Sequence, residues 1–401
     1  MVIISRRGAL RVGAALGLGA AAGARAETVT LPFGNGERPL VRYPQKQPLI
    51  RLTSRPPQLE TPFAVYGESL ITPNDAFFVR YHLAGNVPPQ DLDPDTYRLT
   101  VKGKVQRTLS LSLAEIKALP GAKEIVAVNQ CSGNSRGFSE PRVAGGQAAN
   151  GLMGNARWHG VPLKAVLDRA GVAAGAVQVS FNGLDEPVFP ATPDFTKALE
   201  LDHARDGEVM LAWGMNGADL PVLNGFPLRL VVPGYYGTYW VKHLHEITVL
   251  DKPSDSFWMT SAYRIPDNDC ACVPPGAAAP KTRPIGRYNV RSFITAPAAD
   301  GRVPADREVT VKGFAFDGGS GIARVEVSAD GGQHWAEARL GEDLGKYSFR
   351  GFEAVLRLPA GEHRLMSRAT GRDGGTQPLQ AQWNPAGYMR NVVESVTVTA
   401  A

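Results

Sequence analysis

From about residue 290 to the C-terminus, the chain alternates apolar and polar residues with a period of two and shows no helical period. The alternating segments are Glu308–Phe316, Ile322–Ala329, Ser348–Leu358, His363–Ala369 and Val392–Val398. Such alternation is typical of half-buried β-strands, and Asp330-Gly331-Gly332 is typical of a hairpin turn. Short strands at this spacing predict an all-β sandwich of immunoglobulin type over residues 286–401.

The preceding part of the chain mixes two periods. Ser112-Leu-Ala-Glu115 is a capping box that opens a short helix, and Val161–Ala170 predicts a helix that ends at Gly171. Alternating or β-branched runs predict strands at Tyr97–Val105, Val177–Phe181, Val209–Trp213, Leu228–Val232 and Tyr239–Leu250. A proline-rich connector follows over residues 265–290. We therefore expect a mixed α/β domain over residues 27–285 and an α+β protein as a whole.

The N-terminus has the features of an export signal. Ser5-Arg6-Arg7-Gly8 is a twin-arginine sequence, an apolar run follows, and Ala24-Arg25-Ala26 is an A-x-A cleavage site. The apolar run is about half the ~20 residues that a membrane span needs. Residues 1–26 are therefore predicted to be a twin-arginine signal peptide, which implies a periplasmic protein without a membrane span.

Composition and charge exclude several classes of protein. Hydrophobic residues make up 43% and charged residues 20% of the chain, as in ordinary globular proteins. The net charge is +5, and the signal segment contributes four arginines and no acid, so the remainder carries +1. We find no basic stripe of the kind that binds nucleic acid.

Cysteine usage singles out one residue. The run Glu124–Val128 predicts a strand that delivers Cys131 into a small polar turn, and Arg136 follows. A cation favours the thiolate, which binds metals or attacks electrophiles; a buried, inert thiol is the alternative. Cys270 and Cys272 either form a local disulfide or stay reduced. The pattern Gly133-Asn-Ser-Arg-Gly137 matches a hydrolase nucleophile elbow, but no helical run follows it.

Three other segments hold candidate site residues. Arg80 and His82 alternate in Phe77–His82, so on a strand they share a face that suits an anion. A glycine-bearing loop after Leu228–Val232 ends in Lys242, and with Arg229 it suits a phosphate. His243 and His245 share a face but lack a third ligand, so a packing role is favoured. Tyr263, just before the connector, is a candidate proton donor or domain-interface residue.

Together these segments resemble the sulfite oxidase family of molybdenum enzymes over roughly residues 60–401. The motifs that carry the resemblance are Phe78-Val-Arg-Tyr-His82, Cys131-Ser-Gly-Asn-Ser-Arg136, Phe181-Asn-Gly-Leu-Asp185, Asn224-Gly-Phe-Pro-Leu-Arg229 and Val232-Pro-Gly-Tyr-Tyr-Gly-Thr-Tyr-Trp-Val-Lys242. The resemblance implies a molybdopterin-binding domain with the sulfite oxidase fold, followed by a dimerisation-type sandwich. It also implies one molybdenum–molybdopterin per chain.

The resemblance assigns roles residue by residue. Cys131 is expected to be the protein's thiolate ligand to molybdenum, since soft sulfur suits this metal. The residues expected to hold the pterin and its phosphate are Arg80, Tyr81, His82, Asp185, Asn224, Arg229, Gly237, Trp240, Val241 and Lys242. Arg80, His82, Arg136 and Tyr263 are expected around the substrate oxyanion.

Three positions depart from the family pattern. Asn224 replaces a histidine, Ala148 replaces a tryptophan of the animal pocket, and Ala386 stands where the second domain of animal enzymes contributes an arginine. Arg390 is the candidate substitute for that arginine.

The resemblance implies oxidation of sulfite to sulfate. No C-x-x-C-H haem motif occurs, so we expect no haem in this chain. The electrons are expected to pass singly to a c-type cytochrome, either free or bound as a second subunit. The alternatives are a molybdopterin reductase of nitrate or methionine sulfoxide, and a non-enzymatic immunoglobulin-like binding module. Homodimer and cytochrome heterodimer both stay open.

Overall fold

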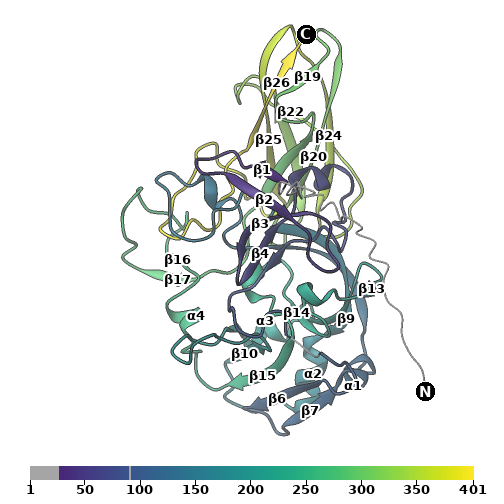
Figure 1. The fold of residues 1–401 in the computed structure, drawn as a ribbon, viewed down its shortest axis with the longest axis vertical. Coiled ribbons are helices and arrows are strands. Elements are labelled where there is room, and N and C mark those ends of the chain that lie inside the picture. The colour runs from purple at the N-terminus through teal and green to yellow at the C-terminus, as the bar shows by residue number, and fades with distance from the viewer. Residues whose placement is uncertain (1–26, 90–91) are drawn as a thin grey trace, which may run out of the picture.

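A computed structural model of the protein describes residues 27–89 and 92–401. The predicted signal peptide, residues 1–26, lies outside the described residues. Two parts follow one another along the long axis of the molecule: a mixed domain with short helices, and a β-sandwich that ends at the C-terminus (Figure 1). This arrangement confirms the predicted fold class. None of the helices in the described part of the chain is long and apolar enough to cross a lipid bilayer.

The described chain begins with a five-stranded antiparallel sheet in the order β1-β2-β3-β4-β5. Its strands are β1 Thr28–Thr30, β2 Glu37–Val41, β3 Leu49–Ser54, β4 Pro57–Glu60 and β5 Val79–Arg80. Leu49, Leu59 and Val79 are buried together on one side of this sheet. The pairing of Leu59 with Val79 fixes β5, and β5 carries Arg80 toward the site described below.

Two sheets form the body of the first domain. One has the order β11-β10-β15-β6-β7 and a parallel β15–β6 pair; the other has the order β13-β12-β9-β8, with β14 paired to β12. Their strands are β6 Arg98–Gly103, β7 Leu109–Ser112, β8 Lys123–Gln130, β9 Met153–Pro162, β10 Gln178–Gly183, β11 Thr196–Glu200, β12 Met210–Met215, β13 Ala218–Asp219, β14 Arg229–Val231 and β15 Leu244–Leu250. A two-stranded ribbon, β16 Arg264–Pro266 and β17 Thr282–Pro284, lies in the predicted connector.

The α-helices are short: α1 Leu113–Lys117, α2 Leu163–Ala170, α3 Leu201–Ala204 and α4 Phe257–Thr260. The capping box of α1 is confirmed, because the Ser112 side chain accepts from Glu115 N and the Glu115 carboxylate accepts from Ser112 N. Helix α2 ends at Gly171, as predicted. It begins two residues later than predicted, since Val161 and Pro162 still pair with β12.

The C-terminal sandwich packs two sheets, β18-β20-β24-β23 and β19-β26-β25-β21-β22. Their strands are β18 Arg291–Ala296, β19 Gly301–Val303, β20 Glu308–Phe316, β21 Ile322–Ser328, β22 Ala336–Glu337, β23 Arg339–Leu340, β24 Arg350–Arg357, β25 Gly361–Gly371 and β26 Ser395–Ala400. Val311, Val325 and Leu365 from the two sheets are fully buried in one core. Alternate burial along the strands produces this core, as the period of two predicts.

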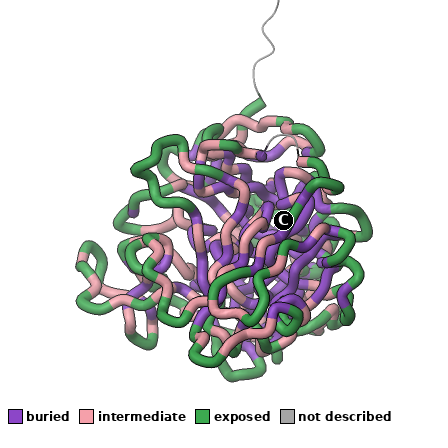
Figure 2. The backbone as a smooth tube through the Cα atoms, turned by 90° about the horizontal axis from the view of Figure 1, so that it is seen from below, coloured by how far each residue is buried: buried purple, intermediate pink, exposed green. Residues whose placement is uncertain are grey.

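Aromatic side chains join the two domains. The ring of Tyr66 lies 5.7 Å from Phe314 and 6.1 Å from Phe349, and Phe63 lies 5.7 Å from Phe293. These rings belong to the same buried cluster as the core of the first domain. Buried backbone therefore runs through the centre of the molecule, with exposed loops around it (Figure 2). The sandwich is fixed against the first domain by apolar packing.

Two predicted strands begin several residues too early, and the first is the C-terminal one, since β26 starts at Ser395 and not at Val392. The pattern predicts Tyr239–Leu250, but β15 begins only at Leu244. Tyr239 ends a short 3-10 helix, Gly237–Tyr239, and His243 has a φ of 48°, a left-handed conformation that a strand excludes. The residues between them form a loop, and this loop contributes to the cavity.

Candidate active site

A half-buried free cysteine stands where strand β8 ends. Cys131 follows Gln130, and its backbone N–H donates to Leu152 O at 2.9 Å. The side chain of Asn134 accepts a hydrogen bond from Leu152 N at 3.0 Å, which closes the turn after the cysteine. These hydrogen bonds fix the backbone that carries the thiol.

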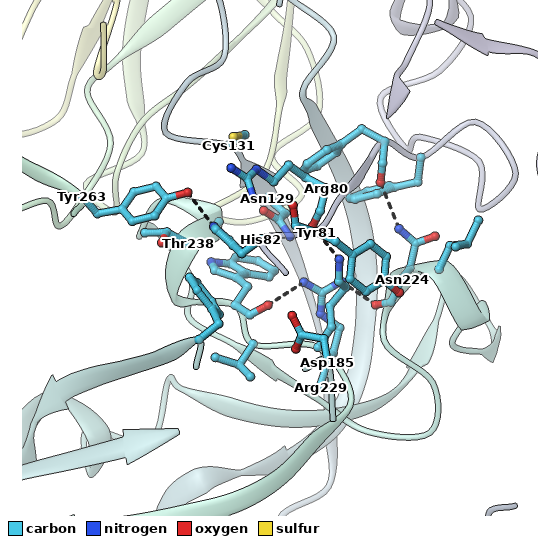
Figure 3. Close-up of a pocket in the computed structure, with 18 residues that line it drawn as sticks. Arg80, Tyr81, His82, Asn129, Cys131, Asp185, Asn224, Arg229, Thr238 and Tyr263 are labelled. Carbon is cyan, nitrogen blue, oxygen red and sulfur yellow. Dashed lines mark hydrogen bonds between the residues drawn. The ribbon is translucent and has the colours of Figure 1, made fainter. Parts of the chain in front are cut away.

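Cys131 lies at a partly open cavity with about 50 Å³ of room for water-sized molecules, within about 620 Å³ of space free of protein atoms that includes open solvent (Figure 3). Seven separate parts of the first domain converge on it. The lining residues are Phe77, Phe78, Arg80, Tyr81, His82, Asn129, Cys131, Asp185, Phe195, Leu223, Asn224, Arg229, Gly237, Thr238, Trp240, Val241, Lys242 and Tyr263. Most of the predicted site residues therefore meet in one cavity, although they are up to 183 positions apart in the sequence (Arg80 and Tyr263).

The last residue of β5 supplies a cation, and the segment that follows supplies an imidazole. Arg80 lies beside Cys131, and its Nη1 donates to Tyr81 O at 2.5 Å (Figure 3). The His82 ring stacks on Phe195 at 3.6 Å between centroids, and its Nε2 lies 2.6 Å from the hydroxyl of Tyr263. Arg80, His82 and Tyr263 thus form one side of the cavity.

The His82–Tyr263 pair is held neutral. Burial lowers the pKa of His82 well below its ordinary value, and the nearby cations Arg80 and Lys242 lower it further. Burial raises the pKa of Tyr263, and Arg80 partly opposes that rise. A neutral imidazole and a protonated phenol 2.6 Å apart can accept and donate a proton at neutral pH.

Two further cations line the cavity. Arg229 is 2% exposed and donates to the backbone oxygens of Asn224 at 2.7 Å and Trp240 at 3.3 Å. Burial lowers the pKa of Arg229 to about 9. Lys242 donates to Arg80 O at 2.6 Å, and burial lowers its pKa well below the usual value. These cations receive little counter-charge from the protein.

Asp185 is the carboxylate among the lining residues. Burial raises its pKa to about 6, and the Lys242 ammonium opposes this rise. Asp185, whose ionised form is disfavoured by burial, is thus the one lining carboxylate near Arg80, Arg229 and Lys242. The lining thus has an excess of positive charge that an anionic ligand would balance.

The lining residues fit a phosphate-bearing molybdopterin with its metal. Three buried polar atoms of the lining have no hydrogen-bond partner within the protein: Asn129 Oδ1, Arg229 Nε and Thr238 Oγ1. Buried polar groups are almost always satisfied, so unpaired ones at a cavity indicate a ligand. The excess of cations suits a phosphate, and the thiol of Cys131 suits a soft metal.

A glycine lets two of these segments approach closely. A Cβ at Gly237 would lie 2.4 Å from Asn129 Oδ1 and 3.2 Å from Gln130 O. Any side chain at this position would therefore separate the Gly237–Val241 loop from the end of β8. The close approach places Thr238 and Trp240 at the cavity beside Asn129.

Two predicted substrate residues are not among the cavity lining. Arg136 Nε donates to Ala386 O at 2.9 Å, and its guanidinium lies 5.1 Å from the ring centre of Tyr388. Arg390 pairs with Glu394 at 3.3 Å. Both arginines lie at the junction with the second domain, where Arg136 faces Tyr388.

Several functional candidates escaped sequence reasoning. Asn129 lies two residues before Cys131, and the strand period could have placed both on one face. Thr238 lies inside a predicted motif but carries no signal of its own. Lys46 is buried and donates to Asn224 Oδ1 at 2.6 Å, while burial lowers its pKa to about 7. No local pattern connects Lys46 with Asn224, 178 residues away.

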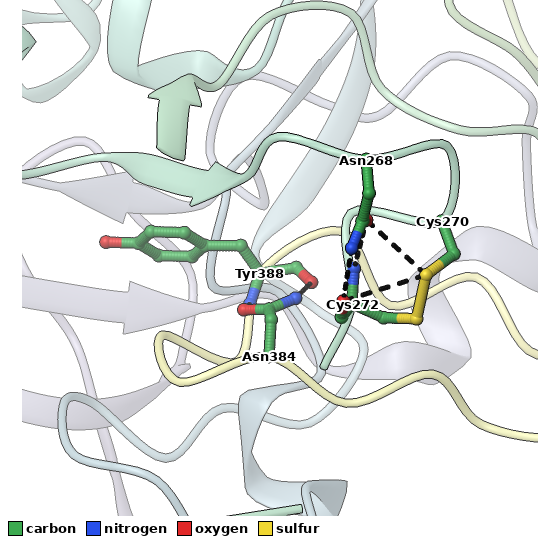
Figure 4. The surroundings of a disulfide bond; sticks show 5 residues. All are labelled: Asn268, Cys270, Cys272, Asn384 and Tyr388. Atoms are coloured by element: carbon green, nitrogen blue, oxygen red, sulfur yellow. Dashed lines mark hydrogen bonds between the residues drawn. A yellow bond between two sulfur atoms is a disulfide. The ribbon is translucent and has the colours of Figure 1, made fainter. Parts of the chain in front are cut away.

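The remaining motifs have structural positions. His243 bonds Tyr81 OH at 2.8 Å and Phe226 O at 2.6 Å, which is the packing role predicted for it. Ser135 Oγ donates to Asn150 Oδ1 at 2.5 Å and is followed by a 3-10 turn, not by the α-helix that a nucleophile elbow opens. Cys270 and Cys272 form a disulfide (Figure 4).

Comparisons with known proteins agree with this site. The model of the oxidoreductase molybdopterin binding domain matches residues 84–258, and that of the Mo-co oxidoreductase dimerisation domain matches residues 282–401. Chicken (Gallus gallus) sulfite oxidase is 34% identical over 372 residues, which cover 88% of this chain and 79% of the relative. Human (Homo sapiens) mitochondrial sulfite oxidase is 36% identical over 379 residues, covering 90% and 67%.

Two further similarities extend the comparison. A nitrate reductase of barley (Hordeum vulgare) is 31% identical over 372 residues, covering 86% of this chain and 41% of the relative. The solved structure of the sulfane dehydrogenase SoxCD from Paracoccus pantotrophus superposes with a TM-score of 0.72 at 25% identity, covering 98% of this chain and 92% of that one. The fold, the two matched domains and the identity to sulfite oxidases show that the chain belongs to the sulfite oxidase family of molybdenum–molybdopterin oxidoreductases.

Proposed function

We propose that this protein oxidises sulfite to sulfate and passes the two electrons one at a time to a c-type cytochrome. The observation that carries the proposal is a single cavity in which a thiol, unbalanced cations and a neutral Tyr–His pair meet. A small dianion is attracted by such a charge distribution, and low local polarity strengthens the attraction. Identity of 34–36% to sulfite oxidases supports this choice of substrate.

Within this proposal the cavity residues divide into two groups. Cys131 supplies the sulfur ligand to the metal. The residues that hold the pterin and its phosphate are Tyr81, Asp185, Asn224, Arg229, Gly237, Trp240, Val241 and Lys242. When bound, molybdenum supplies the two-electron redox change and the oxygen transfer that no side chain can perform.

The other group acts on the substrate. Arg80, beside Cys131, attracts the sulfite dianion and orients it. The overall change is SO₃²⁻ + H₂O → SO₄²⁻ + 2 H⁺ + 2 e⁻, so two protons must leave the cavity. Tyr263 and His82 are placed to move them, because the phenol and the imidazole are 2.6 Å apart and both are neutral. The two electrons leave singly to two cytochrome molecules or to one bound subunit.

Export and the electron acceptor are further parts of the proposal. The twin-arginine sequence at Arg6-Arg7 supports a periplasmic location, because that route carries folded, cofactor-loaded proteins. No C-x-x-C-H motif occurs in the sequence, which supports a separate cytochrome as the acceptor. That cytochrome is either a diffusing partner or a second subunit.

A second candidate function is oxidation of a sulfane sulfur. The likeness to a sulfane dehydrogenase over 98% of the chain favours it. Both reactions remove electrons from a sulfur atom, whereas reduction of nitrate or methionine sulfoxide runs the other way. Parallel assays with sulfite, a sulfane donor, nitrate and methionine sulfoxide separate the candidates.

The deciding experiment uses full-length protein matured in a host that makes molybdopterin. We expect about one molybdenum per chain and sulfite-dependent reduction of ferricytochrome c, with ferricyanide as a second acceptor. A protein that contains molybdenum but reduces neither acceptor with sulfite would contradict the proposed substrate. A metal-free protein with full activity would contradict the proposed chemistry altogether.

A further inference from the structure

We propose that Tyr388, contributed by the second domain, is a positioning residue that holds Tyr263 at the substrate side of the cavity and Arg136 beside it at the domain junction. The proposal rests on the proposed function and adds a residue to it. It assigns to Tyr388 the place for which the sequence suggested Arg390. It also identifies what the sandwich domain contributes to the site.

The ring of Tyr388 connects two residues of the first domain. It stacks on the ring of Tyr263 with 5.5 Å between centroids and 8° between planes. The guanidinium of Arg136 lies 5.1 Å from the centre of the same ring, within the range of a cation–π interaction. Tyr263 in turn bonds His82. A continuous set of contacts therefore leads from the second domain to the cavity wall.

The backbone around Tyr388 is fixed from within its own turn. Asn384 Nδ2 donates to Tyr388 O at 2.8 Å, and Tyr388 N donates back to Asn384 Oδ1 at 3.1 Å (Figure 4). Gly387 N donates to Asn384 O at 3.0 Å. One buried asparagine thus holds both polar backbone groups of Tyr388, which leaves the ring little freedom to turn away.

The same turn is fastened to the first domain on two sides. Val273, next to the Cys270–Cys272 disulfide, donates its N–H to Trp383 O at 2.9 Å. The indole N–H of Trp383 donates to Pro141 O at 2.9 Å. These bonds join residues 383–388 to a disulfide-closed loop and to the segment that follows Arg136.

A glycine shows how tightly the turn packs against Arg136. Gly387 has a φ of 60°, and a Cβ there would lie 2.6 Å from Val143 Cγ2 and 3.0 Å from Arg136 Cγ. Ala386 contributes its carbonyl oxygen, which accepts from Arg136 Nε at 2.9 Å. The turn therefore contacts Arg136 at three places: Gly387 packs on its aliphatic stem, Ala386 O accepts from its Nε, and the Tyr388 ring lies against its guanidinium.

The chemistry of a phenol at this place differs from that of an arginine. Burial raises the pKa of Tyr388, while Arg136 acts in the opposite direction through its charge and a side-chain hydrogen bond. Tyr388 is therefore neutral at physiological pH and adds no third cation to Arg80 and Arg136. Arg390 does not take this role, because its guanidinium pairs with Glu394 at 3.3 Å. The site orients Arg136 through an aromatic face.

The test compares the wild type with Tyr388→Phe and Tyr388→Ala in molybdenum-loaded protein. The matched control is Tyr347→Phe, because the Tyr347 phenol also lies at the domain junction but bonds Glu208, away from the cavity. The measurements are KM and kcat for sulfite across pH 6–9, the Kd of sulfate by calorimetry, and the molybdenum content. Ferricyanide serves as the acceptor, so that cytochrome docking does not enter.

Tyr388→Ala removes the ring and is expected to raise the KM for sulfite and the Kd for sulfate by about 3- to 10-fold, the value of the lost stacking and cation–π contacts, with molybdenum content unchanged. Tyr388→Phe keeps the ring and both contacts, so both constants are expected to stay within about 2-fold of wild type. Tyr347→Phe is expected to leave both constants at wild-type values. A wild-type protein that does not oxidise sulfite would contradict the proposed function. The role of Tyr388 would still be tested in that case, because the Kd for sulfate is measured without turnover.

Two outcomes would overturn the role of Tyr388. The first is a folded Tyr388→Ala protein with wild-type KM and sulfate Kd at full molybdenum content. The second is loss of molybdenum from Tyr388→Phe, which would place the phenol in cofactor binding instead. If Tyr388→Ala unfolds, Tyr388→Leu replaces it, because leucine fills much of the same space without an aromatic face.

Discussion

The cavity of the first domain and the core of the sandwich differ in whether their buried positive charges have carboxylate partners. At the cavity, Arg229 is buried with backbone oxygens as partners and one nitrogen unpaired. The buried side chains of the sandwich core are apolar, such as Val311 and Leu365. Arg291 of the sandwich is buried but pairs with the carboxylate of Glu394 at 3.2 Å, and Arg339 lies at the surface in its pair with Glu353.

The difference shows where each part of the chain obtains its stability. A buried cation without a carboxylate costs several kcal/mol, whereas burial of a Val or Leu side chain contributes about 1.5–3 kcal/mol. The sandwich is therefore complete as a protein fold. The cavity is complete only with an anionic ligand that balances its cations and satisfies its unpaired atoms.

The largest expected effect follows from removing the metal ligand. Cys131→Ser replaces a soft sulfur by a hard oxygen at the end of β8 and is expected to abolish almost all sulfite oxidation. The fold should persist, because the backbone bond from Cys131 N to Leu152 O does not depend on the side chain. Turnover and circular dichroism check both points, and near-normal activity would remove Cys131 from the metal site.

The next effect concerns substrate attraction. Arg80→Met removes the cation beside Cys131 and is expected to raise the KM for sulfite by about 30-fold or more, as for loss of one partner of a buried charge pair. Arg339→Met is the matched control, because it makes the same change in the sandwich, where the side chain of Arg339 is 72% exposed. Steady-state kinetics should give a much higher KM for sulfite in Arg80→Met than in Arg339→Met. Equal KM values would show that the position of the arginine does not matter for sulfite binding.

Arg229→Met sharpens the contrast because stability and cofactor content should move in opposite directions. Methionine removes a buried cation that has no carboxylate partner, so the cofactor-free protein is expected to gain about 1–4 kcal/mol in free energy of unfolding. The same variant should load less molybdopterin, since a phosphate partner is gone. Urea unfolding and metal analysis measure the two effects. A destabilised variant with normal molybdenum content would show that Arg229 is structural.

The last prediction concerns a buried acid of strand β4. Glu60 accepts hydrogen bonds from Ala149 N at 3.1 Å and Gly151 N at 2.8 Å, and burial raises its pKa from 4.5 to about 7. A carboxyl with a raised pKa binds its proton more tightly in the folded state. The stability from Glu60 is therefore full below pH 4.5 and falls by up to about 3 kcal/mol as pH rises to 7.

Glu60→Gln should flatten the dependence of the unfolding free energy on pH between pH 5 and 7. Urea titrations of the cofactor-free protein at several pH values measure this slope. The sandwich gives the opposite case, because a hydrogen bond from Arg339 lowers the pKa of Glu353 at the surface. Identical slopes for wild type and Glu60→Gln would exclude Glu60 as the source of the pH dependence.

Much of the fold could be predicted because its signals are local. The period of two gave β20 its bounds, Glu308–Phe316, without error, and the capping box placed the start of α1 at Leu113. The strand predicted at Tyr239–Leu250 began too early because a left-handed His243 interrupts it. Backbone conformations of that kind arise from packing around the residue, and its own sequence does not encode them.

The sequence by itself determined the sandwich, the Cys131 turn and the motifs whose residues line one cavity. Only the tertiary structure decided which side chains meet across the chain. It turned Arg136 toward Tyr388 and brought Lys46 to Asn224. The physical reason is that periodicity and capping act within a few residues, whereas these contacts depend on how segments far apart in the sequence pack against one another.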